Sequence, residues 1–175
     1  MSTVPLVSII VPVFNQERFL GRCLRSLVAQ DFPAGDYEIV VVNDGSTDGT
    51  GLVLDLFRDE IRVLQNEGNA GLPSALNRGI RSSRSLFTVR VDSDDYVNSA
   101  FIRVLYTFLA QNKYMDAVAC DYFLVNDEEE ILERRNCEES PIACGIMFRT
   151  EQLIEIGLYD EEFLLHEERD LRLRF

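Results

Sequence analysis

Residues 7–11, Val7-Ser8-Ile9-Ile10-Val11 (VSIIV), decide the fold class of this chain. The run is apolar, largely β-branched and without polar alternation, which is typical of a strand buried on both faces of a parallel sheet. Pro12 is predicted to end this strand, and Asn15 to cap the helix that follows. The apolar residues of that helix recur at three- and four-residue steps: Leu20, Cys23, Leu24, Leu27 and Val28. The N-terminal segment therefore predicts a strand, a loop and a helix.

Strands and helices continue to alternate up to residue 91. Apolar runs predict strands over residues 38–42 (EIVVV), 61–64 and 86–91 (LFTVRV), and helical periodicity predicts helices over residues 52–58 and 73–80. This alternation with short links implies a parallel sheet with right-handed crossovers. The loops that follow the strands then gather along one edge of the sheet, where open α/β sheets bind their ligands.

The second half of the chain has a different pattern. A helix is predicted over residues 101–109. Residues 117–125 and 131–134 flank an acidic turn at 126–130, which indicates a hairpin-like excursion with a solvated tip.

The C-terminal segment predicts one more strand and two short helices. Residues 142–148 are a candidate strand, and Thr150 is expected to cap a helix that ends at Gly157. Residues 171–175 (LRLRF) are typical of a helix that is cut early, so we expect the native protein to continue beyond Phe175.

The composition predicts one compact domain over residues 1–175. With 175 residues, of which 46% are hydrophobic, the chain can bury a core. Its 30 acidic and 17 basic residues give a net charge of −13, which argues against non-specific binding of nucleic acid or an anionic membrane. The N-terminus has no basic signal region, and the apolar residues 4–14 are interrupted by two prolines and too short to span a bilayer. We therefore expect a soluble domain.

The cysteines and the single histidine do not form a zinc-binding pattern. The four cysteines contain no C-x-x-C pair, and His166 alone is too little to complete a zinc site. We expect reduced structural thiols, which together with the missing signal peptide predict a cytoplasmic protein.

A dense acidic cluster, Asp92-Ser93-Asp94-Asp95 (DSDD), follows the predicted strand 86–91. Three carboxylates within four residues repel one another, so a fold tolerates them in water, beside cations or around a metal. One hypothesis is a divalent metal that holds a phosphate. The alternative is an acidic loop that caps a helix beginning near Asn98, and these four residues alone do not distinguish the two.

Five stretches of the chain share their order and spacing with one known family: residues 7–15 (VSIIVPVFN), 42–48 (VNDGSTD), 66–72 (NEGNAGL), 75–80 (ALNRGI) and 90–95 (RVDSDD). Together they resemble a family two glycosyltransferase of the GT-A fold. The resemblance implies an α/β, Rossmann-like fold, in which a mostly parallel central sheet is flanked by helices and the second half adds a small antiparallel excursion. Residues 1–97 would bind the nucleotide sugar, and residues 98–175 would form the acceptor side.

The activity that this resemblance implies is an inverting, metal-dependent sugar transfer. The donor would be a nucleotide-diphosphate sugar, expected to be UDP-linked, and the acceptor a hydroxyl group of a glycan, a lipid-linked molecule or another compound. The implied setting is bacterial polysaccharide or cell-surface glycan synthesis. No nucleic-acid partner or transmembrane segment is expected, and peripheral membrane association could come from a C-terminal part beyond residue 175.

The resemblance also implies a role for each motif residue. Asp94 would bind Mn²⁺ or Mg²⁺ bridging the diphosphate, with Asp92 toward the ribose or the metal and Asp95 in support. Asp44 would accept a hydrogen bond from the base, usually uracil. The implied donor-binding residues are Pro12, Val13, Phe14, Asn15, Glu17, Asp44, Gly71, Asn77, Asp92 and Ser93.

Several of these residues also have purely structural interpretations. Asn15 and Glu17 suit the start of a helix, and Asp44 suits a turn. Gly71 would let the backbone approach the nucleotide and Asn77 would line the pocket, unless they belong to an ordinary loop and helix.

One position departs from the pattern of many family members, which carry an arginine where this chain has Leu76. Arg78 and Arg90 are candidates to replace it. Another branch of the family reads A-L-N-x-G-I followed by R-x-D-x-D-D, and this chain follows that branch, so the departure need not mean inactivity.

The catalytic base is expected in the C-terminal acidic segment, because inversion requires a carboxylate on the acceptor side. The family carries an E-D motif shortly before D-L-x-L-R, which places Glu168 where aspartate is usual, with Glu167 and Asp170 as rivals. The alternative is a solvated helix face in which Glu168 and Arg172 pair at i,i+4. Residues 145–149 would form the wall of the acceptor site.

Three other functions compete with sugar transfer. A phosphatase with an aspartate nucleophile also uses D-x-D, but usually at the first strand. A nucleotidyltransferase would need a basic phosphate loop, which the sequence lacks. A nucleotide-sugar-binding module without turnover is the non-enzymatic alternative.

Overall fold

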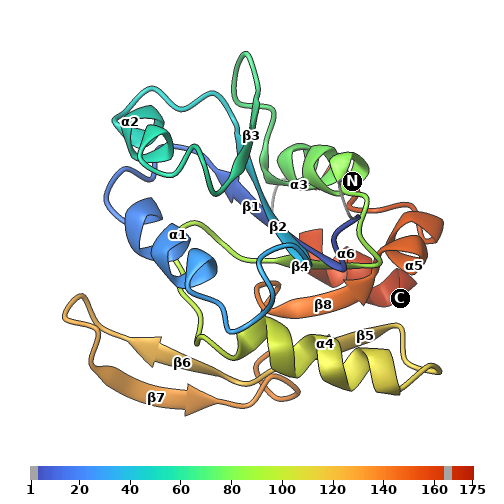
Figure 1. Cartoon of the computed structure of the whole chain (residues 1–175). Coiled ribbons are helices and arrows are strands. Elements are labelled where there is room, and N and C mark those ends of the chain that lie inside the picture. The colour runs from blue at the N-terminus through green and yellow to red at the C-terminus, as the bar shows by residue number, and fades with distance from the viewer. Residues whose placement is uncertain (1–3, 164–166) are drawn as a thin grey trace.

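A six-stranded sheet between two layers of helices forms the body of the protein in a computed structural model that describes residues 4–163 and 167–175 (Figure 1). The elements, in chain order, are β1 (Val7–Val13), α1 (Leu20–Val28), β2 (Tyr37–Asn43), α2 (Thr50–Asp55), β3 (Arg62–Gln65), α3 (Leu72–Ser82), β4 (Phe87–Arg90), α4 (Phe101–Gln111), β5 (Ala117–Ala119), β6 (Tyr122–Val125), β7 (Ile131–Arg135), β8 (Ile146–Arg149), α5 (Thr150–Glu155) and α6 (Glu167–Arg174). The strand order in the sheet is β3-β2-β1-β4-β8-β5.

The four strands of the first half are parallel, as the alternation of strands and helices predicts. β1 lies between β2 and β4, with Ile10 opposite Val40 on one side and opposite Arg90 on the other. All seven residues of β1 are buried, which confirms a strand covered on both faces. The polar loops after β1, β2 and β4 therefore meet at one edge of the sheet.

The first strand is longer than predicted, because it continues through Pro12 to Val13. The Ile10 carbonyl accepts a hydrogen bond from Val91 on the β4 side, and the Val13 carbonyl accepts one from Asp44 on the β2 side. By the alternation of a strand, the nitrogen of Pro12 faces the β4 side, beyond the last residue pair of β1 with β4. A proline is tolerated there because no ladder hydrogen bond is lost.

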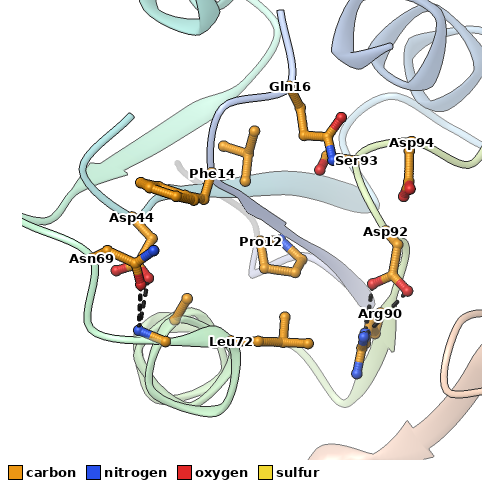
Figure 2. A pocket seen from close by; sticks show the side chains of 13 residues that line it. Pro12, Phe14, Gln16, Asp44, Asn69, Leu72, Arg90, Asp92, Ser93 and Asp94 are labelled. Carbon is orange, nitrogen blue, oxygen red and sulfur yellow. Dashed lines mark hydrogen bonds and ion pairs between the residues drawn. The ribbon is translucent and has the colours of Figure 1, made fainter. Parts of the chain in front are cut away.

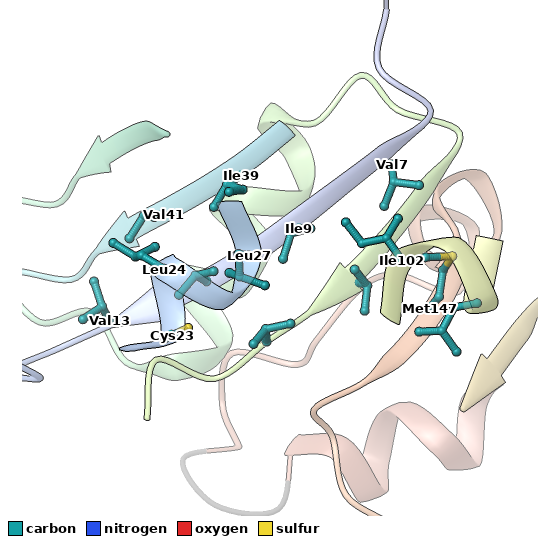
Figure 3. Packing of buried hydrophobic residues seen from close by; sticks show 14 of the residues in the cluster. Val7, Ile9, Val13, Cys23, Leu24, Leu27, Ile39, Val41, Ile102 and Met147 are labelled. Carbon is teal, nitrogen blue, oxygen red and sulfur yellow. The ribbon is translucent and has the colours of Figure 1, made fainter. Parts of the chain in front are cut away.

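The two faces of β1 enter different halves of the core. The Val7, Ile9 and Val13 side chains pack with Leu24 of α1 and with α4 (Figure 3). The opposite face, which includes Ile10, packs under α3, α5 and α6. This three-layer arrangement buries the strand on both sides and fixes the loop that follows it.

The second half completes the sheet with antiparallel strands. β8 pairs with β4, and β5 pairs with β8, whereas β6 and β7 form a separate two-stranded hairpin. The hairpin predicted from residues 117–125 and 131–134 is confirmed, but its first arm is shorter than predicted, because β5 belongs to the main sheet and only β6 pairs with β7. Asp121 lies between β5 and β6, and its carboxylate accepts hydrogen bonds from the Arg134 side chain and from the Cys137 backbone.

Two predicted helix caps, at Asn15 and Thr150, are wrong, and the alternative in which the acidic cluster caps a helix does not hold either. α1 begins at Leu20 rather than beside Asn15, which has a left-handed φ of 53°. α4 begins at Phe101 after Ala100, with no side-chain cap, so the acidic cluster does not cap it. Thr150 is the first residue of α5, and its hydroxyl shares a hydrogen bond with Thr88 instead.

No helix within residues 4–163 and 167–175 is long and apolar enough to cross a membrane.

Candidate functional site

A cavity of about 440 Å³ opens where β1, β2 and β4 end (Figure 2). This volume is within the range of small-molecule sites. The cavity is lined by Pro12, Val13, Phe14, Gln16, Asp44, Asn69, Gly71, Leu72, Ala75, Arg90, Asp92, Ser93 and Asp94. Eight of the sequence-predicted residues thus come together: Pro12, Val13, Phe14, Asp44, Gly71, Asp92, Ser93 and Asp94.

Asp44 holds one side of the cavity together. Its buried carboxylate accepts hydrogen bonds from the Ala70 and Gly71 backbone amides at 3.0 and 2.9 Å, and from the side-chain amide of Asn66. The ring of Phe14 lies beside Asp44 in Figure 2. This side therefore offers an exposed aromatic face next to a loop whose amides converge on one carboxylate.

Close backbone packing also stabilises the side of the cavity that Asp44 forms. Gly45 has a φ of 76°, and a Cβ atom there would lie 2.6 Å from the carbonyl carbon of Gly68. Only glycine can occupy this position without moving the loop at residues 66–71.

Arg90 and Asp92 form the opposite side of the cavity (Figure 2). Arg90 donates from Nε and Nη2 to the two carboxylate oxygens of Asp92, at 2.6 and 3.2 Å, and from Nη1 to Glu167 of α6 at 2.8 Å. Burial alone would lower the pKa of the Arg90 guanidinium, but the charge of Asp92 and the hydrogen bonds to Asp92 and Glu167 raise this pKa above its ordinary value. Arg90 therefore stays charged inside the protein.

The acidic loop brings carboxylates together beside a thiol. One carboxylate oxygen each from Asp92 and Asp95 and the sulfur of Cys144 lie within 4.8 Å of one another, whereas the exposed Asp94 stands at the cavity rim outside this group. Burial raises the pKa of Asp95 despite a hydrogen bond with Cys144, and Asp92 and Asp94 raise it further. Burial also raises the pKa of the Cys144 thiol well above its usual value. The thiol stays protonated at neutral pH, so the available ligands are hard carboxylate oxygens, which suit Mg²⁺ or Mn²⁺.

Asn15 and Glu17 do not line the cavity. The Oδ1 atom of Asn15 accepts a hydrogen bond from the Thr47 amide at 2.8 Å, and Glu17 accepts one from the Gly49 amide at 2.6 Å. The two side chains join the loop after β1 to the loop after β2.

Asn77 lies outside the cavity as well. It is buried, donates to the Tyr159 carbonyl and the Glu161 carboxylate, and accepts from the Tyr159 amide. Asn77 thus fastens α3 to the segment after α5.

The two arginines proposed to replace the family arginine have different positions. Leu76 is fully buried in the core. Arg78 donates to the Gln65 carbonyl and to the Asn66 side chain, away from the cavity lining. Of the two candidates, Arg90 is the one that lines the cavity.

The three candidate bases lie on α6, in the first two turns of the helix. Glu167 is buried against Arg90, and Asp170 pairs with Arg174 at 2.6 Å. Glu168 is half-buried, next to Glu167 in the first turn. His166, which begins the predicted motif segment, lies outside the described residues.

The expected acceptor wall is only partly in place. Residues 146–148 of β8 are buried in the sheet rather than exposed as a wall. Cys144 and Gly145 do approach the acidic loop, since the Gly145 amide donates to the Arg90 carbonyl at 3.0 Å.

Sequence reasoning missed several cavity residues. Gln16, Asn69, Leu72 and Ala75 line the cavity but belong to no motif position that the resemblance assigns a role. For Leu72 and Ala75 the i,i+3 spacing at the start of α3 was an available signal, because it places both on one helix face.

The comparisons with known proteins agree with this geometry. The model of the family "Glycosyl transferase family 2" matches residues 8–166. The chain belongs to glycosyl transferase family 2. It is therefore a glycosyltransferase domain, and its mostly parallel sheet with an added antiparallel pair is the GT-A fold of its structural neighbours.

Three proteins illustrate the similarity: EpsJ and TarS by sequence, and TarS and PcManGT by structure. The "Uncharacterized glycosyltransferase EpsJ" of Bacillus subtilis is 42% identical over 123 residues, which are 69% of this chain and 35% of EpsJ. The poly(ribitol-phosphate) beta-N-acetylglucosaminyltransferase TarS of Staphylococcus aureus is 36% identical over 108 residues, 60% of this chain and 19% of TarS. The structure of TarS 1-349 in complex with UDP-GlcNAc superposes with a TM-score of 0.81 at 25% identity and covers 96% of this chain and 52% of that chain.

The third relative shares the fold alone. The mannosyltransferase PcManGT from Pyrobaculum calidifontis, in complex with GDP-Man and Mn²⁺, has a TM-score of 0.76 at 21% identity, covering 97% of this chain and 52% of that chain. This chain thus spans about a third of EpsJ and about half of either structure.

Proposed function

We propose that this domain transfers a sugar from a UDP-linked donor to an acceptor hydroxyl, with inversion and with the help of Mn²⁺ or Mg²⁺. The observation that carries the proposal is one cavity with two unlike sides. Phe14 and Asp44 form the first side, and Arg90, Asp92 and Asp94 the second. A nucleotide sugar has the same division, since its base is flat and polar at the edges and its diphosphate is charged.

The proposed donor orientation follows from these two sides. The base packs against Phe14, and Asp44 accepts a hydrogen bond from a ring N–H while it holds the loop at residues 66–71. Asp92 meets the ribose or the metal, and Asp94 and Asp95 supply the remaining carboxylates. When bound, the metal neutralises the diphosphate and acts as a Lewis acid on the leaving group. TarS, whose structure contains UDP-GlcNAc, supports a UDP-linked donor.

The proposed base is Glu168, on the first turn of α6. Glu168 is preferred to its rivals Glu167 and Asp170 because it stands at the motif position where the family usually carries an aspartate. Glu167 is also buried against Arg90. Glu168 would take the proton of the acceptor hydroxyl as its oxygen attacks the anomeric carbon opposite the diphosphate. Glu168→Gln should spare UDP binding and lower sugar transfer by about a hundredfold or more.

The proposed setting is the synthesis of a bacterial cell-surface glycan in the cytoplasm. The names of TarS and of a Bacillus spizizenii relative contain poly(ribitol-phosphate), which supports a bacterial polymer as the acceptor. All four cysteines are free, which fits a reducing compartment.

A titration calorimetry experiment tests the metal and the donor together. UDP is titrated into the protein with Mn²⁺ and with EDTA, and UDP-GlcNAc is then incubated to measure the release of UDP. We expect binding that requires Mn²⁺, followed by slow metal-dependent release. Tight binding without release would favour the binding module, and no binding of UDP would contradict the proposal.

Asp94→Ala is the variant that tests the metal assignment. Asp94 is exposed, so its removal should leave the fold intact, while the Mn²⁺-dependent part of UDP affinity is lost. Asp59→Ala, at an equally exposed aspartate after α2, is the matched control. Unchanged UDP affinity in the Asp94 variant would show that the metal binds elsewhere.

A further inference from the structure

A buried arginine joins the acidic loop to the C-terminal helix. Arg90 is the last residue of β4, and its side chain is 8% exposed. Its guanidinium contacts two carboxylates that lie 75 residues apart in the chain, those of Asp92 and Glu167. These contacts connect the cavity to α6, which contributes no residue to the cavity lining.

Its backbone is held independently of the side chain. Arg90 lies opposite Ile10 of β1, and its carbonyl accepts a hydrogen bond from Gly145 at 3.0 Å. The guanidinium therefore extends from a fixed strand end toward both carboxylates.

The contact with Asp92 is a bidentate fork, which fixes both the position and the orientation of the Asp92 carboxylate. Nε and Nη2 reach different oxygens of Asp92, so rotation of the carboxylate would break at least one hydrogen bond. A lysine could not reproduce this, because an ammonium group is a point charge without the planar fork.

The contact with Glu167 anchors the start of α6. The Glu167 side chain is 7% exposed, and a buried carboxylate without a cation is costly. The C-terminal half of α6 has separate anchors, since Leu171 is in the core and Arg174 donates to the Ile156 and Leu158 carbonyls. Loss of the Arg90 contact should therefore loosen the first turn, which also carries Glu168, while the helix stays docked.

We infer that Arg90 is a positioning residue, which holds the Asp92 carboxylate in the orientation that the donor requires and couples it to the first turn of α6 through Glu167. This inference rests on the proposed donor site. It assigns Arg90 to an interaction with two protein carboxylates, rather than to the donor phosphates.

The first experiment compares two arginines that donate to a carboxylate through Nε and Nη2, in UDP titrations with Mn²⁺. Arg90→Lys should raise the Kd of UDP about tenfold or more, as replacing the partner of a metal-site carboxylate typically does. Arg62→Lys is the control: Arg62 donates from Nε and Nη2 to one carboxylate oxygen of Glu38, at 3.2 and 3.1 Å, and does not line the cavity. An unchanged Kd in Arg90→Lys, or an equal loss in Arg62→Lys, would overturn the inference.

A second comparison separates positioning from direct contact, since Arg90 also lines the cavity. Arg90→Lys is repeated in an Asp92→Asn background. If Arg90 acts through Asp92, the lysine causes no further loss there. The same tenfold loss in both backgrounds would mean that Arg90 touches the ligand itself, which would overturn the positioning role.

The third measurement tests the link to α6. Glu167→Gln keeps an acceptor for Nη1 but removes the charge, so we expect a UDP Kd within about threefold of the wild type. The kcat for metal-dependent UDP release from UDP-GlcNAc should fall on the order of tenfold, because the first turn of α6 shifts. An unchanged kcat would remove α6 from the inference. If Arg90→Lys fails to fold, this variant still tests the coupling to α6 through Glu167. Wild-type protein that binds no UDP would instead refute the proposed function, and the inference with it.

Discussion

Asp44 shows how one buried carboxylate can organise a wall of the cavity. The sequence predicted Asp44 as an acceptor for the base, yet in the structure its oxygens already accept hydrogen bonds from Asn66, Ala70 and Gly71. These donors lie 22 to 27 residues further along the chain. A sequence motif identifies the polar residue, but it does not reveal which distant amides reach it.

Asp44→Asn should weaken both the loop and the nucleotide site. One carboxylate oxygen becomes an NH₂ group facing backbone N–H donors, so we expect a loss of about 2 kcal/mol in unfolding free energy. The Kd of UDP with Mn²⁺ should rise about tenfold, because the loop at residues 66–71 moves. Urea unfolding and calorimetry measure the two effects, with Asp59→Asn as control. A stable variant with wild-type UDP affinity would contradict the role of Asp44.

Gly45 is a second residue whose identity the site requires. Gly45→Ala places a Cβ 2.6 and 2.7 Å from two backbone atoms of Gly68, at a φ of 76°. We expect a loss of about 2 kcal/mol or more, because neither the backbone nor the φ can adapt cheaply.

Gly51→Ala is the matched control for this change. A Cβ on Gly51, in α2, meets nothing within 4 Å, and the helix should gain about 0.5 kcal/mol from the substitution. Thermal unfolding of the two variants should therefore shift in opposite directions, and a shift in the same direction would contradict the packing argument.

At the scale of elements, the sequence predicts where strands and helices occur better than how they join. The β-branched runs of β1 and β2 are buried on both faces, so their pattern is unambiguous. β5 and β6 have mixed burial, and Asp121, which lies between them, contacts residues 134 and 137 where the chain passes from one sheet to the other. Such long-range polar contacts leave no local periodicity to detect.

The hairpin of β6 and β7 behaves largely as its acidic composition indicates. Its tip is exposed, and Asp127 pairs with Arg18 of the segment before α1 with both side chains at least 67% exposed. This exposed ion pair contributes little to stability, but the tip makes a second contact with α1, where Glu129 lies 3.5 Å from Arg22.

A shared hydroxyl contact links β4 to α5. The Thr88 and Thr150 hydroxyls lie 2.8 Å apart and are both buried. Thr150→Val leaves the Thr88 hydroxyl without a partner, which should cost about 1–3 kcal/mol. The double variant Thr88→Val with Thr150→Val removes both polar groups and should recover to within about 1 kcal/mol of the wild type.

Urea unfolding of the two single variants and the double variant checks this cycle. Additive losses would mean that the hydroxyls do not act as a pair, and would leave the junction of β4 and α5 to apolar packing alone.

At the scale of the whole molecule, the general arrangement could be predicted and the details of the site only in part. Parallel topology brings the loops of β1, β2 and β4 to one edge, so the cavity and most of its residues follow from the order of elements. Asn77 was expected to line the cavity but lies outside it. Its side-chain amide donates hydrogen bonds to residues 159 and 161, which belong to a segment with no motif. The Arg90–Glu167 contact depends on how α6 docks, which local sequence does not determine.

The buried thiol and phenol groups of the core and the site make the stability of the whole fold sensitive to alkaline pH. Burial, followed by the charges of Asp95, Asp92 and Asp94, raises the pKa of the Cys23 thiol from 9.0 to about 12. Burial likewise raises the pKa of Cys144 and of Tyr159. Each group keeps its proton in the folded state at a pH where the unfolded chain has released it.

This difference determines the sign of the pH dependence. Above pH 9.0 the unfolded chain binds fewer protons than the folded protein, so the unfolding free energy falls as pH rises toward 12. Each such group contributes a slope of at most about 1.4 kcal/mol per pH unit. Guanidinium unfolding at pH 7.5, 9 and 10.5 should show constant stability to about pH 9 and a decline beyond it. Cys23→Ala should have a shallower decline, because it removes one titrating group, and an identical slope in both proteins would contradict the role of the thiol.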